Sequence, residues 1–284
     1  MAFTTLIDTD ALAAQLDDPS WVVVDCRFDL ADTAWGGRVY AERHIRRAVY
    51  AHLDRDLSGV KTGRNGRHPL PDPAALAVTL GRFGIDDSTQ VVVYDQDTGM
   101  FASRLWWELR WLGHDAVAVL DGGFAKWIAE GKPTGDRVES PASRVFRPRP
   151  RPAMVADVAE VEALRTRADA RLVDARAPER YRGESETIDR VAGHIPGARN
   201  HFFKGNLDAR GVFLPKEELR TRLEPEFGGV DSQRIVSYCG SGVTACHNLL
   251  ALEHVGIHGA RLYPGSWSEW SSDPARPTAG SDDQ

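Results

Sequence analysis

The chain has 284 residues, 42% of them hydrophobic and 27% charged, and its net charge is −6 at pH 7. This length suits two domains of about 130–150 residues, and the negative charge gives no reason to expect nucleic acid or a membrane surface as a partner. The N-terminal residues do not resemble a signal peptide, and we find no apolar run long enough to span a membrane. Three cysteines, an odd number, predict free thiols in a reducing compartment, with the cytoplasm as the default.

The sequence resembles itself across its two halves. Asp25 in VVVDCR matches Asp174 in RLVDAR, and His44 in AERHI matches His194 in VAGHI. The segment VVVYDQDTGMFASRLWWELRWLG then runs parallel to RIVSYCGSGVTACHNLLALEHVG. Matches in a constant order, with a slowly drifting offset, predict two homologous domains.

The domain boundaries follow from composition. We expect a first domain over residues 1–132 and a second over 154–284. The Pro- and Arg-rich residues 133–153 lack a periodic pattern, which predicts an extended linker. The tail looks poorly ordered from about residue 274.

In the second half, short apolar runs alternate with segments of helical period. The expected strands cover residues 171–176, 234–239 and 260–265, and the expected helices cover 157–168, 216–223 and 243–256. Gly256 is the expected stop of the last helix. This alternation predicts an α/β fold, with a mostly parallel sheet flanked by helices on both faces in each half.

One strand runs directly into CGSGVT, and a helix follows. Ligands of open parallel sheets gather at the carboxyl ends of strands, so Cys239 stands where a reactive group belongs. Glycine allows positive φ and close approach, so the N–H groups of residues 240–244 can turn toward an anion. Such a loop lowers the pKa of its cysteine below about 8.5. We expect Cys239 to be a nucleophile, and a buried structural cysteine is the alternative.

Other chemistries at this turn lack residues that they need. A cysteine phosphatase loop needs an arginine six residues after its cysteine, where position 245 is alanine. A G-x-S-x-G elbow around Ser241 lacks both glycines, and no P-loop motif is found. Cys239, Cys246 and His247 do not match zinc spacings, so we expect neither a metal nor another cofactor.

The repeat supplies an internal comparison, because Asp95 stands in the first half where Cys239 stands in the second. A carboxylate cannot act as the thiolate would, so we expect the first half to be catalytically silent. Cys246 lies on the apolar side of its expected helix and Cys26 lies at a strand end. Both are expected to be buried in the core.

From VVVDCRF to GSWSEW the chain resembles the tandem rhodanese-type sulfurtransferases. The motifs VDARAPERYRGE, AGHIPGA, CGSGVTAC and YPGSWSEW carry the resemblance. The uncharged loop after Cys239 is similar to the 3-mercaptopyruvate branch, whereas the thiosulfate branch carries basic residues there. The resemblance implies ping-pong sulfur transfer, in which Cys239 takes a sulfane sulfur as a persulfide and an acceptor collects it.

The resemblance also implies roles for particular side chains. Ser241 matches a serine that works with a histidine and an aspartate, here His68 and Asp54, to relay a proton as the carbon–sulfur bond breaks. Arg180 in ERYRG matches an arginine that holds the anionic group of the donor. The loop residues implied to hold the donor sulfur are Gly240, Gly242, Val243 and Thr244.

One departure leaves the donor open. The second anion-binding arginine of the branch falls close to Thr187 here, and the nearby Arg190 is the expected substitute. A thiosulfate:cyanide sulfurtransferase and a persulfide carrier that docks on a partner protein remain alternatives. Besides the small-molecule donor, the expected partner is a sulfur acceptor: cyanide, a small thiol or a reduced thioredoxin.

Overall fold

The structure is a computed structural model that describes residues 2–280. The chain divides into two compact units. The first consists of Met1–Gly59, Pro71–Arg151 and Ala209–Val212, and the second consists of Val60–Leu70, Pro152–Asp208 and Phe213–Gln284. The segment Val60–Leu70 therefore comes from the first half of the sequence but packs with the second unit.

The first unit is built on a parallel sheet with the strand order β1-β6-β5-β2-β4. Its strands are β1 (Leu6–Ile7), β2 (Trp21–Asp25), β4 (Val49–Tyr50), β5 (Gln90–Tyr94) and β6 (Val117–Leu120), and an antiparallel pair is formed by β3 (His44–Ile45) and β7 (Thr134–Gly135). Its helices are α1 (Thr9–Ala13), α2 (Trp35–Glu42), α3 (Leu53–Asp56), α4 (Pro73–Arg82), α5 (Ala102–Trp111) and α6 (Gly123–Ala129).

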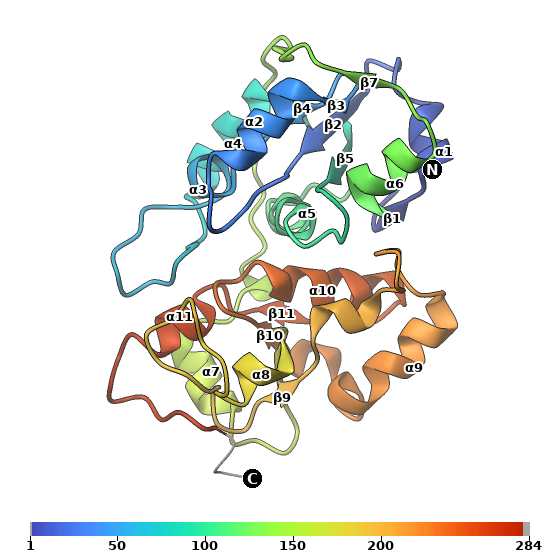
Figure 1. Ribbon diagram of the computed structural model, residues 1–284. Coiled ribbons are helices and arrows are strands. Elements are labelled where there is room, and N and C mark those ends of the chain that lie inside the picture. Colours follow the sequence, from blue (N-terminus) through green and yellow to red (C-terminus); the bar gives the residue numbers. More distant parts are fainter. Residues whose placement is uncertain (1, 281–284) are drawn as a thin grey trace. The chain divides into compact units, whose positions relative to one another are not determined.

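The second unit repeats this plan with the strand order β11-β10-β8-β9, again parallel throughout (Figure 1). Its strands are β8 (Arg171–Asp174), β9 (Arg199–Asn200), β10 (Ile235–Tyr238) and β11 (Arg261–Leu262). Its α-helices are α7 (Val158–Leu164), α8 (Pro178–Tyr181), α9 (Lys216–Phe227), α10 (Thr244–His254) and α11 (Ser266–Trp270), and its 3₁₀ turns are Pro152–Met154, Phe203–Asn206 and Ser232–Arg234.

These elements confirm the α/β fold with parallel sheets. Helices lie on both faces of each sheet in Figure 1, and every residue of β10 is buried, as a strand covered on both faces requires. Helix α7 begins at a capping box formed by Asp157 and Glu160. Helix α10 ends just before Gly256, which takes a φ of +85° that favours glycine.

The internal repeat is visible as a duplicated ion pair. Arg27 donates to Asp25 at the end of β2 across 2.7 Å, and Arg176 donates to Asp174 at the end of β8 across 2.7 Å. All four side chains are at most 2% exposed. A buried pair of this kind tolerates the loss of neither partner, so it fixes the chain at the same strand end in both units.

Two connecting segments are held by main-chain contacts. In the segment after β7, Arg144 N–H donates to Gly81 O across 2.9 Å, so this segment packs along the first unit. In the tail, residues 274–280 were expected to be poorly ordered, yet the N–H of Ala279 donates to His194 O across 3.0 Å. Residues 281–284 lie outside the described part. Among residues 2–280, no helix has the length and apolarity needed to cross a bilayer.

Candidate active site

The candidate nucleophile Cys239 follows β10 directly and precedes α10. Its side chain is only 2% exposed. The N–H of Gly242 donates to its sulfur across 3.2 Å. Gly242 adopts a φ of +76°, which turns this amide inward and is strained for residues with a side chain. The loop therefore places main-chain dipoles around the sulfur, as the sequence predicted.

Two opposing effects set the pKa of the Cys239 thiol. Burial raises it, because a charged sulfur loses its hydration. The Thr244 hydroxyl and the N–H groups of Ser241 and Ala245 lower it by donating to the sulfur, and the pKa lies below its ordinary value. The hydrogen bonds outweigh the desolvation. The loop thus favours the thiolate, which is the nucleophilic form.

Helix α11 holds the cysteine loop in place. Trp267 N–H donates to Cys239 O across 2.9 Å, and Ser268 N–H donates to Gly240 O across 3.0 Å. The fully buried Ser266 accepts from Cys239 N–H across 3.1 Å and donates to Tyr263 O across 2.9 Å. The SWSEW motif carried the resemblance in the sequence, but its part in fixing the loop emerges only from these contacts.

Asp95 occupies the matching position of the first unit and uses the same anion-binding loop. Its carboxylate accepts from Gly99 N–H across 2.9 Å and from Phe101 N–H across 2.7 Å. Burial raises the pKa of Asp95 to about 6, against the lowering effect of these amides. Phe124 N–H donates to Asp95 O across 2.9 Å, as Trp267 N–H does to Cys239 O. Both loops therefore surround a side-chain anion, and only the second offers a thiol.

His68 and Ser241 meet at the cysteine loop. His68 Nδ1 lies 2.8 Å from Ser241 Oγ, and both side chains are buried. Their contact spans 173 positions of sequence and lies within the second unit, since His68 belongs to Val60–Leu70. Asp54 lies in α3 of the first unit, where its N–H donates to His52 Nδ1 across 3.1 Å.

Arg180 lies at the same loop, in the last turn of α8. Its Nη2 would be 3.7 Å from a Cβ built on Gly240. Glu186 accepts from this guanidinium across 2.8 Å. A tyrosine stacks on a histidine at the matching place in each unit. The residue before that tyrosine is Val39 in the first unit and Arg180 in the second. Arg180 is therefore specific to the unit that carries the cysteine.

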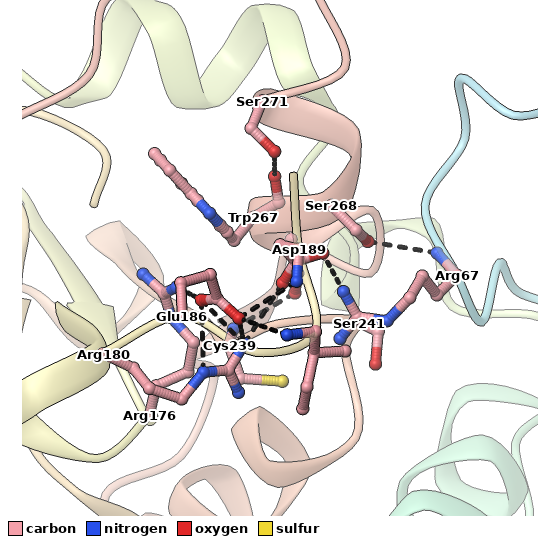
Figure 2. A network of polar contacts seen from close by, with 12 residues as sticks. Arg67, Arg176, Arg180, Glu186, Asp189, Cys239, Ser241, Trp267, Ser268 and Ser271 are labelled. Carbon is pink, nitrogen blue, oxygen red and sulfur yellow. Dashed lines mark hydrogen bonds and ion pairs between the residues drawn. The ribbon is translucent and has the colours of Figure 1, made fainter. Parts of the chain in front are cut away.

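A second arginine at this loop was not singled out from the sequence. Arg67 Nη2 would lie 2.8 Å from a Cβ on Gly240, and its guanidinium is paired with Asp189. Asp189 also accepts from Arg180 across 3.2 Å. Figure 2 shows Arg67 on one side of Asp189, with Arg180 and Glu186 on the other. The sequence contained one hint of this role, because Arg67 directly precedes His68. The sequence does not show, however, which residue pairs with a charged side chain in a polar loop.

The remaining predicted residues are located as follows. Arg190 is exposed, one position after the well-buried Asp189. Val243 is buried just before α10, whose first residue is Thr244. Cys246 is fully buried, with its thiol donating to Gly242 O across 3.3 Å, and Cys26 is 2% exposed. Both are core residues, as predicted. In the described residues no cluster of three or more His, Cys, Asp or Glu could hold a metal ion.

Comparisons with known proteins show the family of this chain. The family model of the rhodanese-like domain matches residues 8–130 and 157–273. The chain is 48% identical to the "Probable 3-mercaptopyruvate sulfurtransferase" of Pseudomonas aeruginosa, over 99% of this chain and 100% of that one. It is 34% identical to the thiosulfate sulfurtransferase of Rattus norvegicus, over 94% and 92% of the two chains.

Among solved structures, the chain is similar to a 3-mercaptopyruvate sulfotransferase from Escherichia coli, at a TM-score of 0.81 and 29% identity. The match covers 93% of this chain and 99% of that one. A duplicated α/β unit, a cysteine in an amide-lined loop of the second unit and full-length relatives all lead to one assignment. The chain belongs to the rhodanese-like family, as one of its two-domain sulfurtransferase enzymes.

Proposed function

We propose that this enzyme moves a sulfane sulfur from 3-mercaptopyruvate, through a persulfide on Cys239, to a small-molecule acceptor. The observation that carries the proposal is the lowered pKa of a buried cysteine whose sulfur accepts from loop amides. The loop residues 240–245 carry no charge, which favours a singly charged donor over the doubly charged thiosulfate. The name of the Pseudomonas aeruginosa relative supports the same donor.

The first half-reaction transfers the sulfur atom. The Cys239 thiolate attacks the sulfur of 3-mercaptopyruvate, a sulfur–sulfur bond forms, and the carbon–sulfur bond breaks with its electron pair going to carbon. The resulting pyruvate enolate takes up one proton, which balances the proton that the donor thiol loses as the persulfide anion forms, and it leaves as pyruvate. The amides and the hydroxyl that stabilise the Cys239 thiolate then stabilise the persulfide anion in the same way.

We assign the proton transfer to Ser241 and His68. The hydroxyl of Ser241 lies within hydrogen-bond reach of His68 Nδ1, at 2.8 Å, and both residues belong to the unit that carries Cys239. Asp54 is the proposed partner of His68. Arg180, with a guanidinium next to Gly240, is proposed to bind the donor carboxylate.

In the second half-reaction a nucleophilic acceptor attacks the outer sulfur of the persulfide and releases the Cys239 thiolate. A small thiol and cyanide are the proposed small-molecule acceptors, and reduced thioredoxin is the proposed protein acceptor. The first unit is proposed to be catalytically silent, because the amides of its loop already hold the Asp95 carboxylate. Three free cysteines suit a reducing compartment, and we propose that the enzyme works in the cytoplasm.

Thiosulfate is the second candidate donor, supported by the name of the Rattus norvegicus relative and by the two arginines at Gly240. Intact mass spectrometry after exposure to each donor separately tests both. We expect a gain of one sulfur atom that cyanide reverses and that Cys239→Ser lacks. A ratio of kcat/KM that favours 3-mercaptopyruvate supports the first donor. An unchanged rate in His68→Ala would contradict the relay.

A further inference from the structure

One carboxylate joins two arginines beside the nucleophile. Asp189 Oδ1 pairs with Arg67, and Asp189 Oδ2 pairs with Arg180. Both guanidinium groups also approach Gly240, the residue that follows Cys239. The Asp189 side chain is only 5% exposed, so this bridge is built into the interior of the site and is not a surface ion pair.

The main chain around Arg67 is held by contacts to helix α11 and to the cysteine loop. Its main-chain N–H donates to Ser268 Oγ across 3.0 Å. The next residue, His68, contacts Ser241 across 2.8 Å. Burial lowers the pKa of the Arg67 guanidinium, and the negative charge of Cys239 raises it. The Arg67 guanidinium therefore lies within electrostatic range of Cys239.

The charges of this cluster balance before any donor arrives. Arg67 and Arg180 contribute two positive charges, and Asp189 and Glu186 contribute two negative charges. A donor that brings its own carboxylate therefore meets guanidinium groups that are already paired. Asp189 carries the same functional group as that donor, and its two oxygens engage the two arginines as a bound carboxylate would.

We propose that Arg67 binds the anionic group of the sulfur donor together with Arg180, and that the Asp189 carboxylate bridging them sets the preference for singly over doubly charged donors. This proposal rests on the sulfur-transfer function given above. Arg67 is a donor-binding residue, and Asp189 is a positioning residue that acts through the two arginines. Because Coulomb repulsion scales with charge, Asp189 disfavours a dianion about twice as strongly as a monoanion.

The test measures binding apart from turnover. In protein carrying Cys239→Ser, the affinities of 3-mercaptopyruvate and of thiosulfate are measured by calorimetry at constant ionic strength. Adding Arg67→Gln should weaken both by about tenfold or more, since charge-assisted hydrogen bonds are lost. Adding Asp189→Asn should improve thiosulfate relative to 3-mercaptopyruvate by about fivefold or more. Arg182→Gln is the matched control, because Arg182 is 40% exposed and pairs with Glu184.

Steady-state rates with Cys239 present separate donor binding from damage to His68. Arg67→Gln should raise KM and leave kcat within about threefold, whereas a displaced His68 would lower kcat. Arg67→Lys keeps the charge without the planar fork and should recover part of the affinity.

Several results would overturn the proposal. It fails if Arg67→Gln binds both donors normally, if Arg190→Gln causes the loss instead, or if neither donor binds the Cys239→Ser protein. Equal changes for both donors in Asp189→Asn would refute the selectivity. The proposed function is judged separately, because it fails if wild-type protein gains no sulfur. If donor binding depends on Arg67 but no persulfide forms, Arg67 is still a donor-binding residue and the proposed sulfur transfer is rejected.

Discussion

Replacing Thr244 by valine removes one donor from the Cys239 sulfur and keeps the shape of the side chain. The Thr244 hydroxyl is the largest of the effects that lower the pKa of this thiol. A hydrogen bond to a charged group contributes about 1.5–3 kcal/mol, and one pKa unit corresponds to about 1.4 kcal/mol. Thr244→Val should therefore destabilise the thiolate relative to the thiol by about 1.5–3 kcal/mol and raise the pKa of Cys239.

The sign of the effect follows from the direction of the native shift. The lowered pKa of wild-type Cys239 means that the thiolate persists to more acidic pH than for an ordinary cysteine. Losing the hydroxyl moves the titration toward alkaline pH. At a pH where the wild-type thiol is only partly ionised, the fraction of thiolate should fall, and the rate of persulfide formation should fall with it.

The assay is the pH dependence of alkylation by iodoacetamide, followed at Cys239 by peptide mass spectrometry. Cys26 is as buried as Cys239, at 2% exposed, but burial raises the pKa of the Cys26 thiol. Its slow reaction therefore serves as an internal reference. Thr221→Val is the matched control, since its hydroxyl donates to Glu217 O within helix α9. If the alkylation profile of Thr244→Val overlays that of the wild type, the hydroxyl does not stabilise the thiolate and the argument is refuted.

Three further outcomes are expected. Gly240→Ala places a Cβ 2.8 Å from Arg67 Nη2, so it should raise the donor KM without lowering the midpoint of urea unfolding; an unchanged KM would contradict this. Asp25→Asn removes the carboxylate partner of the buried Arg27 and should cost about 3–5 kcal/mol in urea unfolding. Asp174→Asn should cost less, because Arg176 keeps Glu186 at 3.4 Å; a neutral Asp25→Asn would contradict this reasoning. Ser266→Ala removes the hydrogen-bond partner of Cys239 N–H and of Tyr263 O. It should lower the free energy of unfolding by about 1–3 kcal/mol, which urea unfolding also measures.

Much of the fold could be predicted because its signals are local. The strand over 234–239 and the helix over 243–256 were recognisable from apolar runs and from Gly256, and the structure has β10 and α10 there. Strand 260–265 was recognised at its correct place but is shorter, since β11 covers Arg261–Leu262. Each of these features depends on residues a few positions apart.

The nucleophilic role of Cys239 could also be proposed from the sequence, since the loop, the strand before it and the helix after it are contiguous. Its stabilisation required no distant residue, because the donors to the sulfur come from positions 241–245. The resemblance added His68 and Ser241, whose contact at 2.8 Å joins residues 173 positions apart. Spacing along the chain could not have supplied that pair.

Two parallel α/β units and a cysteine turn that favours a thiolate could be predicted from the amino-acid order alone, because main-chain hydrogen bonding and hydrophobic period act over short separations. The charges that surround that turn became known only from the folded chain. Arg67 reaches Asp189 across 122 positions, because the segment Val60–Leu70 leaves the first half and packs with the second unit. The pairing of a flexible charged side chain is set by the surface onto which its segment packs, and no local pattern encodes that surface.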